Sequence, residues 1–485
     1  MAAMGSHRAF RPGIELARAN SARHGAQRDG YAPYADEYAR RPGRTNTART
    51  RARRGISPVR PTKKLLILIT GVVVAVAGVV AFAASAAARR SASGHVTSAT
   101  TASHARSGTH ATKSLHGITA VSAGIGLRPG AISPSAAGVA AARAVLPALD
   151  AYQLAGQRVI YSYKGLTPPA NLLWAIRHGR VAGVIFFTDN VGSSAHITAV
   201  AKELQQANAA KTNPVRLPLL LMTDQEGGVV RRLNGPPVPS AKQIGASAHP
   251  RQEATKEGAA AGAFMHGLGV NVDLAPVLDV YRTPGNFIDE FGRSFSNDPA
   301  KVAKLGSLFA TAMQGKSVAA TVKHFPGLGA ATRTQNTDER PVTLNLTLSQ
   351  IRSVDELPYA SAVAAKVKLA MVSWARYPAL DEKFPAGLSS AIVQGELRKR
   401  LGFAGVTITD ALEAGALKNF GGTASRATLA AKAGMDLLLC ASENYGQGVT
   451  ALKALRTDYL GSSATARASF KAAAERILAL RATLG

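Results

Sequence analysis

Eight short apolar runs, separated by longer amphipathic segments, constrain the fold of residues 135–485 more than any other feature. Each run is a nearly continuous block of apolar residues, as in parallel strands that are covered on both faces. The runs are Arg158–Tyr163, Val181–Phe187, Leu217–Thr223, Val270–Pro276, Ala319–His324, Leu369–Trp374, Val406–Thr409 and Asp436–Cys440. Strands alternating with helices in this number predict an α/β fold, a (β/α)8 barrel of the TIM type, with a doubly wound parallel sheet as the alternative.

Two of the intervening segments carry start signals for helices. The sequence Ser296–Pro299 combines a capping side chain with an early proline, which predicts a helix that begins there. A pair of serines at 389 and 390 precedes a second predicted helix over Ala391–Leu401, which Gly402 ends. These signals support helices between the strands, as the barrel requires.

The first 134 residues differ in composition from the rest of the chain. Residues 1–64 are rich in Arg, Ala, Gly and Pro without apolar periodicity, which predicts a disordered basic segment. Residues 89–134 are rich in Ser, Thr, Ala and Gly, which predicts a flexible tether. Between them, residues 65–88 carry no charge and are long enough to cross a bilayer as one helix, for which about 20 apolar residues suffice.

The charges before residues 65–88 predict how this segment would lie in a membrane. Lys63, Lys64 and many Arg residues precede it, so the positive-inside rule places the N-terminus in the cytoplasm and residues 135–485 outside the cell membrane. The alternative is a secretory signal that is cleaved near Ala84–Ala86 and releases the domain. We therefore expect a single-pass membrane anchor, with secretion as the alternative.

The net charge of +29 is uneven, because residues 1–130 carry +16 of it. A basic chain can indicate nucleic-acid binding, but the sequence has no zinc-ligand spacing, RNA-binding aromatic signature or basic heptad region. We expect no nucleic-acid partner and favour attraction to anionic lipid or an anionic cell-wall polymer. The single cysteine, Cys440, excludes an internal disulfide and is expected to be a small buried residue.

Charged residues follow several of the predicted strands, and in a (β/α)8 barrel the carboxyl ends of the strands carry the functional residues. The charged residues at these ends are Asp224, Glu226, Asp273, Asp279, Lys323, His324 and Asp410. Carboxylates together with Lys or Arg groups suit the hydroxyls of a sugar, and paired carboxyl groups suit cleavage of a glycosidic bond. The sequence has no phosphate-binding loop or dinucleotide fingerprint, and its histidines are too scattered for zinc. No metal or organic cofactor is expected.

Five segments, in this order along the chain, resemble the signatures of glycoside hydrolase family 3. They are Leu217–Leu233, Gly269–Val280, Phe291–Phe295, Lys323–Gly327 and Leu388–Leu412. The resemblance covers about residues 150–440. It is greatest to the bacterial β-N-acetylglucosaminidases that have a single barrel, without the sandwich domain of the family's β-glucosidases.

The resemblance implies a role for each matching position. Asp410 matches the nucleophile, and the residues that match sugar-binding positions are Asp224, Arg232, Arg293, Lys323 and His324. Trp374 ends the sixth run, where its ring either stacks on a sugar face or packs in the core. Glu226 is expected to hold its own Gly-Gly turn, while Asp273 and Asp279 are expected to brace the loop around Pro276.

The sequence departs from the family pattern at the acid/base position. In the N-acetylglucosaminidase branch, the loop after the Lys-His strand carries an Asp-Ser-His motif, whose His is the acid/base. Residues 327–340 contain no histidine, and Asn336–Asp338 falls near the expected place. Asp338 or Glu339 can serve as the acid if its pKa is raised. The alternatives are an acid from another loop, transfer of the sugar to phosphate, or an Asp338 that only caps a turn.

These observations predict a retaining exo-β-N-acetylhexosaminidase that removes terminal GlcNAc from glycans derived from the cell wall, including peptidoglycan. Asp410 would form the glycosyl-enzyme, and Asp338 would be the acid/base. The alternatives are another β-glycosidase of the family, a phosphorylase, and a wall-glycan-binding protein with weak or no catalysis.

Overall fold

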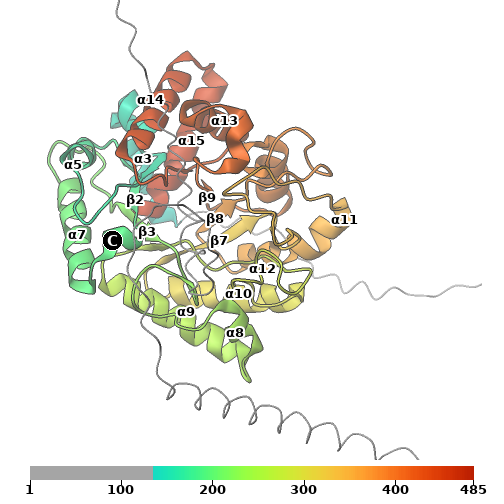
Figure 1. The fold of residues 1–485 in the computed structure, drawn as a ribbon. Helices are drawn as coiled ribbons and strands as arrows, with labels where there is room; N and C mark the ends of the chain where they lie inside the picture. The colour runs from blue at the N-terminus through green and yellow to red at the C-terminus, as the bar shows by residue number, and fades with distance from the viewer. Residues whose placement is uncertain (1–134, 485) are drawn as a thin grey trace, which may run out of the picture. The chain divides into compact units, whose positions relative to one another are not determined.

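A parallel sheet of eight strands forms the centre of residues 135–484, which are the residues that the computed structural model describes (Figure 1). The expectations for residues 1–64, 65–88 and 89–134 lie outside the described residues. The strands in chain order are β1 (Val159–Tyr161), β2 (Gly183–Ile185), β3 (Leu220–Thr223), β6 (Val272–Asp273), β7 (Ala319–Phe325), β8 (Leu369–Val372), β9 (Val406–Thr409) and β10 (Leu438–Leu439). Each lies in one of the predicted apolar runs, except that β7 extends one residue beyond its run, to Phe325.

The strand order identifies the sheet as a nearly closed barrel. The order is β10-β1-β2-β3-β6-β7-β8-β9, so each strand lies beside its neighbour in sequence, and all pairs are parallel. The two ends meet where the Leu437 amide donates to the Thr407 carbonyl at 2.9 Å and the Thr409 amide donates to the Leu437 carbonyl at 3.0 Å. The barrel prediction is confirmed in this form. The doubly wound alternative is wrong, because the strand order does not reverse.

Helices surround the strands (Figure 1). The α-helices are α3 (Ala136–Val145), α4 (Ala151–Gly156), α5 (Ala170–Arg177), α6 (Thr188–Val191), α7 (Ser194–Asn208), α8 (Ala241–Ala246), α9 (Pro250–Gly267), α10 (Pro299–Gln314), α11 (Leu348–Gln350), α12 (Leu357–Ala364), α13 (Thr423–Ala433), α14 (Tyr445–Gly461) and α15 (Ala464–Arg481). Short 3-10 helices cover Leu146–Ala148, Ala386–Leu388 and Gly415–Phe420, and helices of π type cover Ile351–Asp355 and Ala391–Arg400.

Both predicted helix starts are found. Asp298 caps α10 by accepting a hydrogen bond from the Ala300 amide at 2.9 Å, and Pro299 is the first helical residue. The helix predicted from Ala391 begins at that residue, although its hydrogen bonds are those of a π-helix. None of the helices in residues 135–484 is both long and apolar enough to span a membrane.

Apolar side chains fill the barrel interior and the layer between strands and helices. Ile160, Leu220 and Ile408 belong to the interior cluster, whereas Tyr161 and Leu221 belong to the outer cluster. Neighbouring residues on a strand therefore point to opposite faces, and both faces are buried. Cys440 is buried, as predicted. Polar side chains of the strands reach solvent only where the strands end. A site built from strand residues therefore lies at these ends.

Candidate active site

A pocket at the carboxyl ends of the strands brings together six of the eight residues predicted for the site. These are Asp224, Arg293, Lys323, His324, Asp338 and Asp410. Its remaining lining residues are Glu226, Val230, Phe287, Leu328, Thr337 and Met371. They come from the ends of β7 and β8 and from the segments that follow β3, β6, β7 and β9, as expected for strands whose ends converge on one face.

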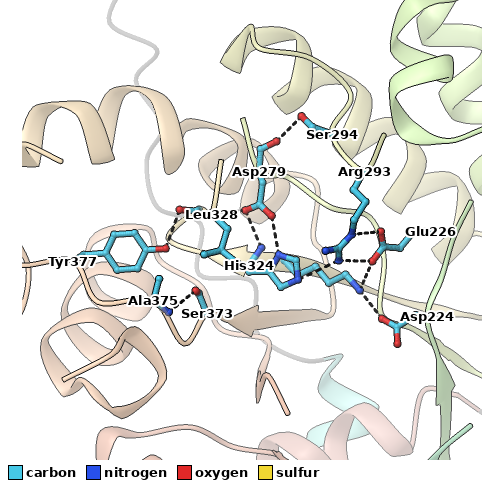
Figure 2. A network of polar contacts seen from close by, with 12 residues as sticks. Asp224, Glu226, Asp279, Arg293, Ser294, His324, Leu328, Ser373, Ala375 and Tyr377 are labelled. Carbon is cyan, nitrogen blue, oxygen red and sulfur yellow. Dashed lines mark hydrogen bonds and ion pairs between the residues drawn. The ribbon is translucent and has the colours of Figure 1, made fainter. Parts of the chain in front are cut away.

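An ion network occupies one side of the pocket (Figure 2). The Lys323 ammonium lies 2.6 Å from Asp224 Oδ1 and 2.7 Å from Glu226 Oε1. The Arg293 guanidinium binds both Glu226 oxygens, with Nε at 2.8 Å and Nη2 at 2.7 Å. Within residues 135–484, the second oxygen of Asp224 is buried without a hydrogen-bond partner. That oxygen can accept a hydrogen bond from a ligand hydroxyl.

Glu226 is a charged member of this network, so the expectation that it only holds its own turn was wrong. Burial alone would raise the pKa of Glu226, but the positive charges of Arg293 and Lys323 outweigh burial and lower it to about 2. Burial alone would lower the pKa of Lys323, but Asp224 and Glu226 raise it above its ordinary value. Glu226 and Lys323 are therefore charged at neutral pH, and the carboxylates hold both cations in place.

A short hairpin brings Glu226 to the pocket. Its strands, β4 (Gln225–Gly227) and β5 (Val230–Arg231), were not predicted. Gly227 and Gly228 form the turn with φ values of +98° and +59°, which favour glycine. A Cβ atom on Gly227 would lie 2.3 Å from the Pro239 carbonyl oxygen. The Gly-Gly pair is thus required for the turn that directs Glu226 inward.

His324 is held by Asp279, a residue expected to be structural. His324 Nδ1 lies 2.7 Å from Asp279 Oδ2, and its backbone amide donates to Asp279 Oδ1 at 3.2 Å (Figure 2). Asp279 also accepts from the Leu328 amide at 2.7 Å, so it braces the loop as well. Arg293 Nη2 lies 3.4 Å from His324 Nε2. These contacts fit a tautomer with the proton on Nδ1, which leaves Nε2 as the acceptor that faces the pocket.

Two carboxyl groups, Asp410 and Asp338, lie on the other side of the pocket. Asp410 directly follows β9, and its Oδ1 accepts a hydrogen bond from the Ala411 amide at 2.8 Å. Burial, together with the negative charge of Asp410, raises the pKa of Asp338 to about 8. At neutral pH, the Asp338 carboxyl therefore keeps its proton. Such a pair supplies both a nucleophile and an acid.

Backbone contacts fix the Asp338 loop to the turn that follows Asp410. The Gly415 amide donates to the Asp338 carbonyl at 2.7 Å, and the Ala416 amide donates to the Thr337 carbonyl at 3.0 Å. A Cβ atom on Gly415 would lie 2.2 Å from the Glu339 carbonyl oxygen, so the two segments touch without space for a side chain. The Glu339 carboxylate is outside the pocket and pairs with Arg340 at 2.7 Å. The geometry therefore favours Asp338 over Glu339 as the acid.

Two further carboxyl groups lie near the pocket, the half-buried Glu413 and the buried Asp273. Burial raises the pKa of Glu413 to about 7, and its Oε2 accepts from Gln447 Nε2 at 2.9 Å. The sequence interpretation missed Glu413, although its position three residues after Asp410 places it on the same turn. Burial raises the pKa of Asp273 to about 8, and Asp273 accepts from the Gln225 amide at 3.0 Å, which agrees with the structural role expected for it.

Trp374 and Arg232 are not among the residues that line the pocket. The Trp374 side chain is only 1% exposed, and its indole N–H donates to the Ala411 carbonyl at 2.8 Å. Its ring therefore supports the turn after Asp410 and is not placed to stack on a sugar. Arg232 is buried at the end of the hairpin, where its backbone amide donates to the Asp224 carbonyl at 3.2 Å.

A nearly closed (β/α)8 barrel with carboxyl groups and cations around one pocket at its carboxyl ends defines a glycoside hydrolase. The chain belongs to glycosyl hydrolase family 3, because residues 153–480 match the model of the "Glycosyl hydrolase family 3 N terminal domain". Within residues 135–484, no group of His, Cys, Asp and Glu side chains has the arrangement of a metal site.

Known proteins similar to this chain agree with the family. An uncharacterized secreted glycosyl hydrolase from Arthroderma benhamiae is 46% identical over 346 residues, which are 71% of this chain and 97% of that protein. Beta-hexosaminidase A from Pseudoalteromonas piscicida is 34% identical over 56% of this chain, which spans about half (48%) of that enzyme. The structure of a family 3 β-N-acetylglucosaminidase from Paenibacillus sp. matches with a TM-score of 0.64 and 34% identity, over 69% of this chain and 63% of that one.

Proposed function

We propose that this protein is a retaining exo-β-N-acetylhexosaminidase that removes terminal GlcNAc from glycans derived from the cell wall. The observation that carries the proposal is the pair of carboxyl groups in one pocket, Asp410 and Asp338, of which burial and the charge of Asp410 keep the second protonated near neutral pH. Relatives named β-hexosaminidase and β-N-acetylglucosaminidase support the choice of sugar.

In the first half of the reaction, a carboxylate oxygen of Asp410 attacks the anomeric carbon, and the bond to the leaving oxygen breaks. Asp338 gives its proton to that oxygen, and a glycosyl-enzyme remains on Asp410. In the second half, water attacks the anomeric carbon, and Asp338 accepts the proton of the water. The ester bond to Asp410 breaks, and the sugar leaves with its original configuration.

The ion network would hold the terminal sugar. Asp224 offers its unpaired oxygen to a hydroxyl, and Lys323 and Arg293 offer positively charged donors from their fixed positions. His324 offers Nε2 as an acceptor. Arg232 retains the sugar-binding role implied by the family resemblance, from its place at the end of the β4–β5 hairpin.

The charges of the pocket favour water over phosphate as the acceptor. Four carboxyl groups line the pocket, against the two permanent cations Arg293 and Lys323. Once Asp338 has given up its proton and Asp410 carries the sugar as an ester, three carboxylates face the two cations, and the net charge of about −1 repels an anionic acceptor but not a neutral one. The proposal is therefore hydrolysis, and the raised pKa of Asp338 supports an active enzyme over a protein that only binds glycans.

The proposed place of action is outside the cytoplasmic membrane. The Arthroderma relative is described as secreted, which supports export of the domain. Residues 65–88 would provide either the membrane anchor or a cleaved signal. Peptidoglycan fragments with terminal GlcNAc are the proposed natural substrates.

Turnover of nitrophenyl β-N-acetylglucosaminide by the full-length protein tests the proposal. We expect the wild-type protein to release nitrophenol, Asp410→Asn to lose essentially all turnover, and Glu382→Gln to keep it. Glu382 is an exposed carboxylate away from the pocket, so it controls for the change from acid to amide. A folded wild-type protein that releases nothing from this or other nitrophenyl sugars would refute the proposal.

A further inference from the structure

A second cavity, of about 390 Å³, lies at the carboxyl ends of β1 and β10, on the face of the barrel that carries the active site. The loop after β1 and the loop after β10 form its walls. Its lining residues are Tyr163, Lys164, Thr167, Pro169, Ser442, Glu443, Asn444 and Tyr445. A cavity of this size can accommodate a small ligand such as one or two sugar units.

A chain of contacts links one wall of this cavity to the turn that carries Asp410. The Ser442 amide donates to Gln447 Oε1 at 3.1 Å, and Gln447 Nε2 donates to Glu413 Oε2 at 2.9 Å. Glu413 lies three residues after Asp410. The loop after β10 is therefore held in a fixed relation to the active-site turn.

Glu443 lines the cavity from the loop after β10. Burial raises the pKa of the Glu443 carboxyl group most, and the negative charge of Asp189 raises it further. The positive charges of Lys164 and Arg232 lower this pKa. These three residues follow β1, β2 and β3, so Glu443 lies within electrostatic range of three neighbouring loops of the rim. The Arg232 amide donates to the Asp224 carbonyl, so a residue whose charge acts on Glu443 is bonded to a residue of the active site.

The backbone of Glu443 has a φ of +54°, a left-handed conformation that a non-glycine residue rarely adopts. Such strained positions are concentrated at functional sites. The following residue, Asn444, caps α14 by accepting from the Gly446 amide at 2.8 Å. The turn thus fixes Glu443 in place at the start of a long helix.

Tyr445 gives the cavity a fixed aromatic wall. Its ring stacks on the buried ring of Tyr161, with 5.6 Å between the centroids and 27° between the planes. A half-buried ring beside a carboxylate, an ammonium group, an amide and a hydroxyl suits a ligand with an apolar ring face and many hydroxyls.

We propose that this cavity is the leaving-group subsite, which binds the sugar units on the far side of the bond to be cleaved. The inference rests on the proposed function, because a leaving-group subsite exists only if the neighbouring pocket cleaves a glycosidic bond. It makes a GlcNAc oligosaccharide, rather than a simple glycoside, the preferred substrate. Tyr445 contacts the sugar ring, and Glu443 accepts hydrogen bonds from its hydroxyls.

The test compares two substrates in the full-length protein, nitrophenyl β-N-acetylglucosaminide and triacetylchitotriose. Tyr445→Ala and Glu443→Gln should each lower kcat/KM for the trisaccharide about tenfold, because the first removes the contact to the sugar ring and the second replaces a charged acceptor of its hydroxyls by a neutral amide. The same variants should leave kcat/KM for the nitrophenyl glycoside within about twofold. Glu382→Gln, on the exposed surface, should leave both values unchanged.

Two results would overturn the subsite: equal loss on both substrates, or no loss on either. Should the wild-type protein cleave neither substrate, the proposed function fails, and calorimetric binding of the trisaccharide decides on the cavity separately. Weaker binding to folded Tyr445→Ala than to the wild-type protein supports a sugar site in the cavity. Equal binding, or no binding to either protein, refutes it.

Discussion

Replacing Gly415 with alanine should push the loop of Asp338, the proposed acid/base, away from the turn that follows Asp410, the proposed nucleophile. The new Cβ would lie 2.2 Å from the Glu339 carbonyl oxygen and 2.9 Å from the Asp338 carbonyl oxygen. Because ordinary contacts begin at about 3.4 Å, the two segments must move apart by about 1 Å. Gly415 does not have a positive φ, so the effect of the new methyl group comes from this clash.

The expected loss follows from the role of Asp338. A misplacement of about 1 Å in a catalytic group can cost about 10²-fold, and complete loss of general acid help costs about 10²–10⁴-fold. We expect kcat/KM to fall about 10²-fold for substrates with a poor leaving group. The dinitrophenolate group of a dinitrophenyl glycoside leaves without protonation. The rate at which this substrate forms the glycosyl-enzyme should therefore fall much less.

The assay measures kcat/KM for a series of aryl N-acetylglucosaminides with leaving groups of different acidity. Gly395→Ala is the matched control, because a Cβ atom there meets nothing within 4 Å. The rate of the Gly415→Ala variant should depend more steeply on the leaving group than that of the wild-type protein or the control. An unchanged dependence, or an equal loss on all leaving groups, would refute the reasoning.

Three further predictions follow from the charges of the pocket. Because burial and Asp410 raise the pKa of Asp338 to about 8, kcat/KM of the wild-type protein should fall as the pH rises through about 8 and Asp338 loses its proton. The residual rate of Asp338→Asn should not show this fall at alkaline pH, and a fall that persists in the variant would contradict the assignment of Asp338 as the acid. Lys323→Met leaves the buried Asp224 without its cation, while Glu226 keeps only Arg293, so the free energy of unfolding measured with urea should fall by about 3–5 kcal/mol; a change below 1 kcal/mol would show that Lys323 does not hold the network. Added phosphate should neither raise the rate of nitrophenol release nor yield a sugar phosphate by mass spectrometry, because the pocket repels anions; a rate that rises with phosphate would point to a phosphorylase.

The sequence was sufficient to predict the barrel but not the lengths of its strands. Each apolar run contains a strand, because parallel strands are buried on both faces and must be apolar. The run Val270–Pro276 contains only the two paired residues of β6, since apolar character records burial and not hydrogen bonding. The hairpin of β4 and β5 was missed, because it is short and polar and turns at Gly227 and Gly228.

The composition of the pocket was predictable where it depended on strand ends and not where it depended on long-range pairs. Glu226 pairs with Arg293 and Lys323, which lie 67 and 97 residues further along the chain, and no local pattern records such pairs. The orientation of Trp374 could have been inferred from the alternation of side chains. Met371 faces the pocket and Val372 packs outside the barrel, so Trp374, two residues later, packs outside as well.

The expectations for the first 134 residues remain predictions. These are the basic segment, the membrane anchor or signal at 65–88, and the tether. Comparing the membrane and soluble fractions of cells that produce the full-length protein would distinguish an anchor from a cleaved signal. An anchored protein keeps its full mass in the membrane fraction, whereas a cleaved one loses residues 1 to about 86.

Trapping the glycosyl-enzyme tests the central claim, that Asp410 is the nucleophile of a retaining hexosaminidase, most directly. The full-length protein is incubated with a fluorinated N-acetylglucosaminyl fluoride, which forms the covalent intermediate faster than water removes it, and is then examined by peptide mass spectrometry. The account predicts one added sugar on the peptide that contains Asp410, and none in Asp410→Asn. A sugar on another residue, or turnover of the reagent without any adduct, would contradict the account.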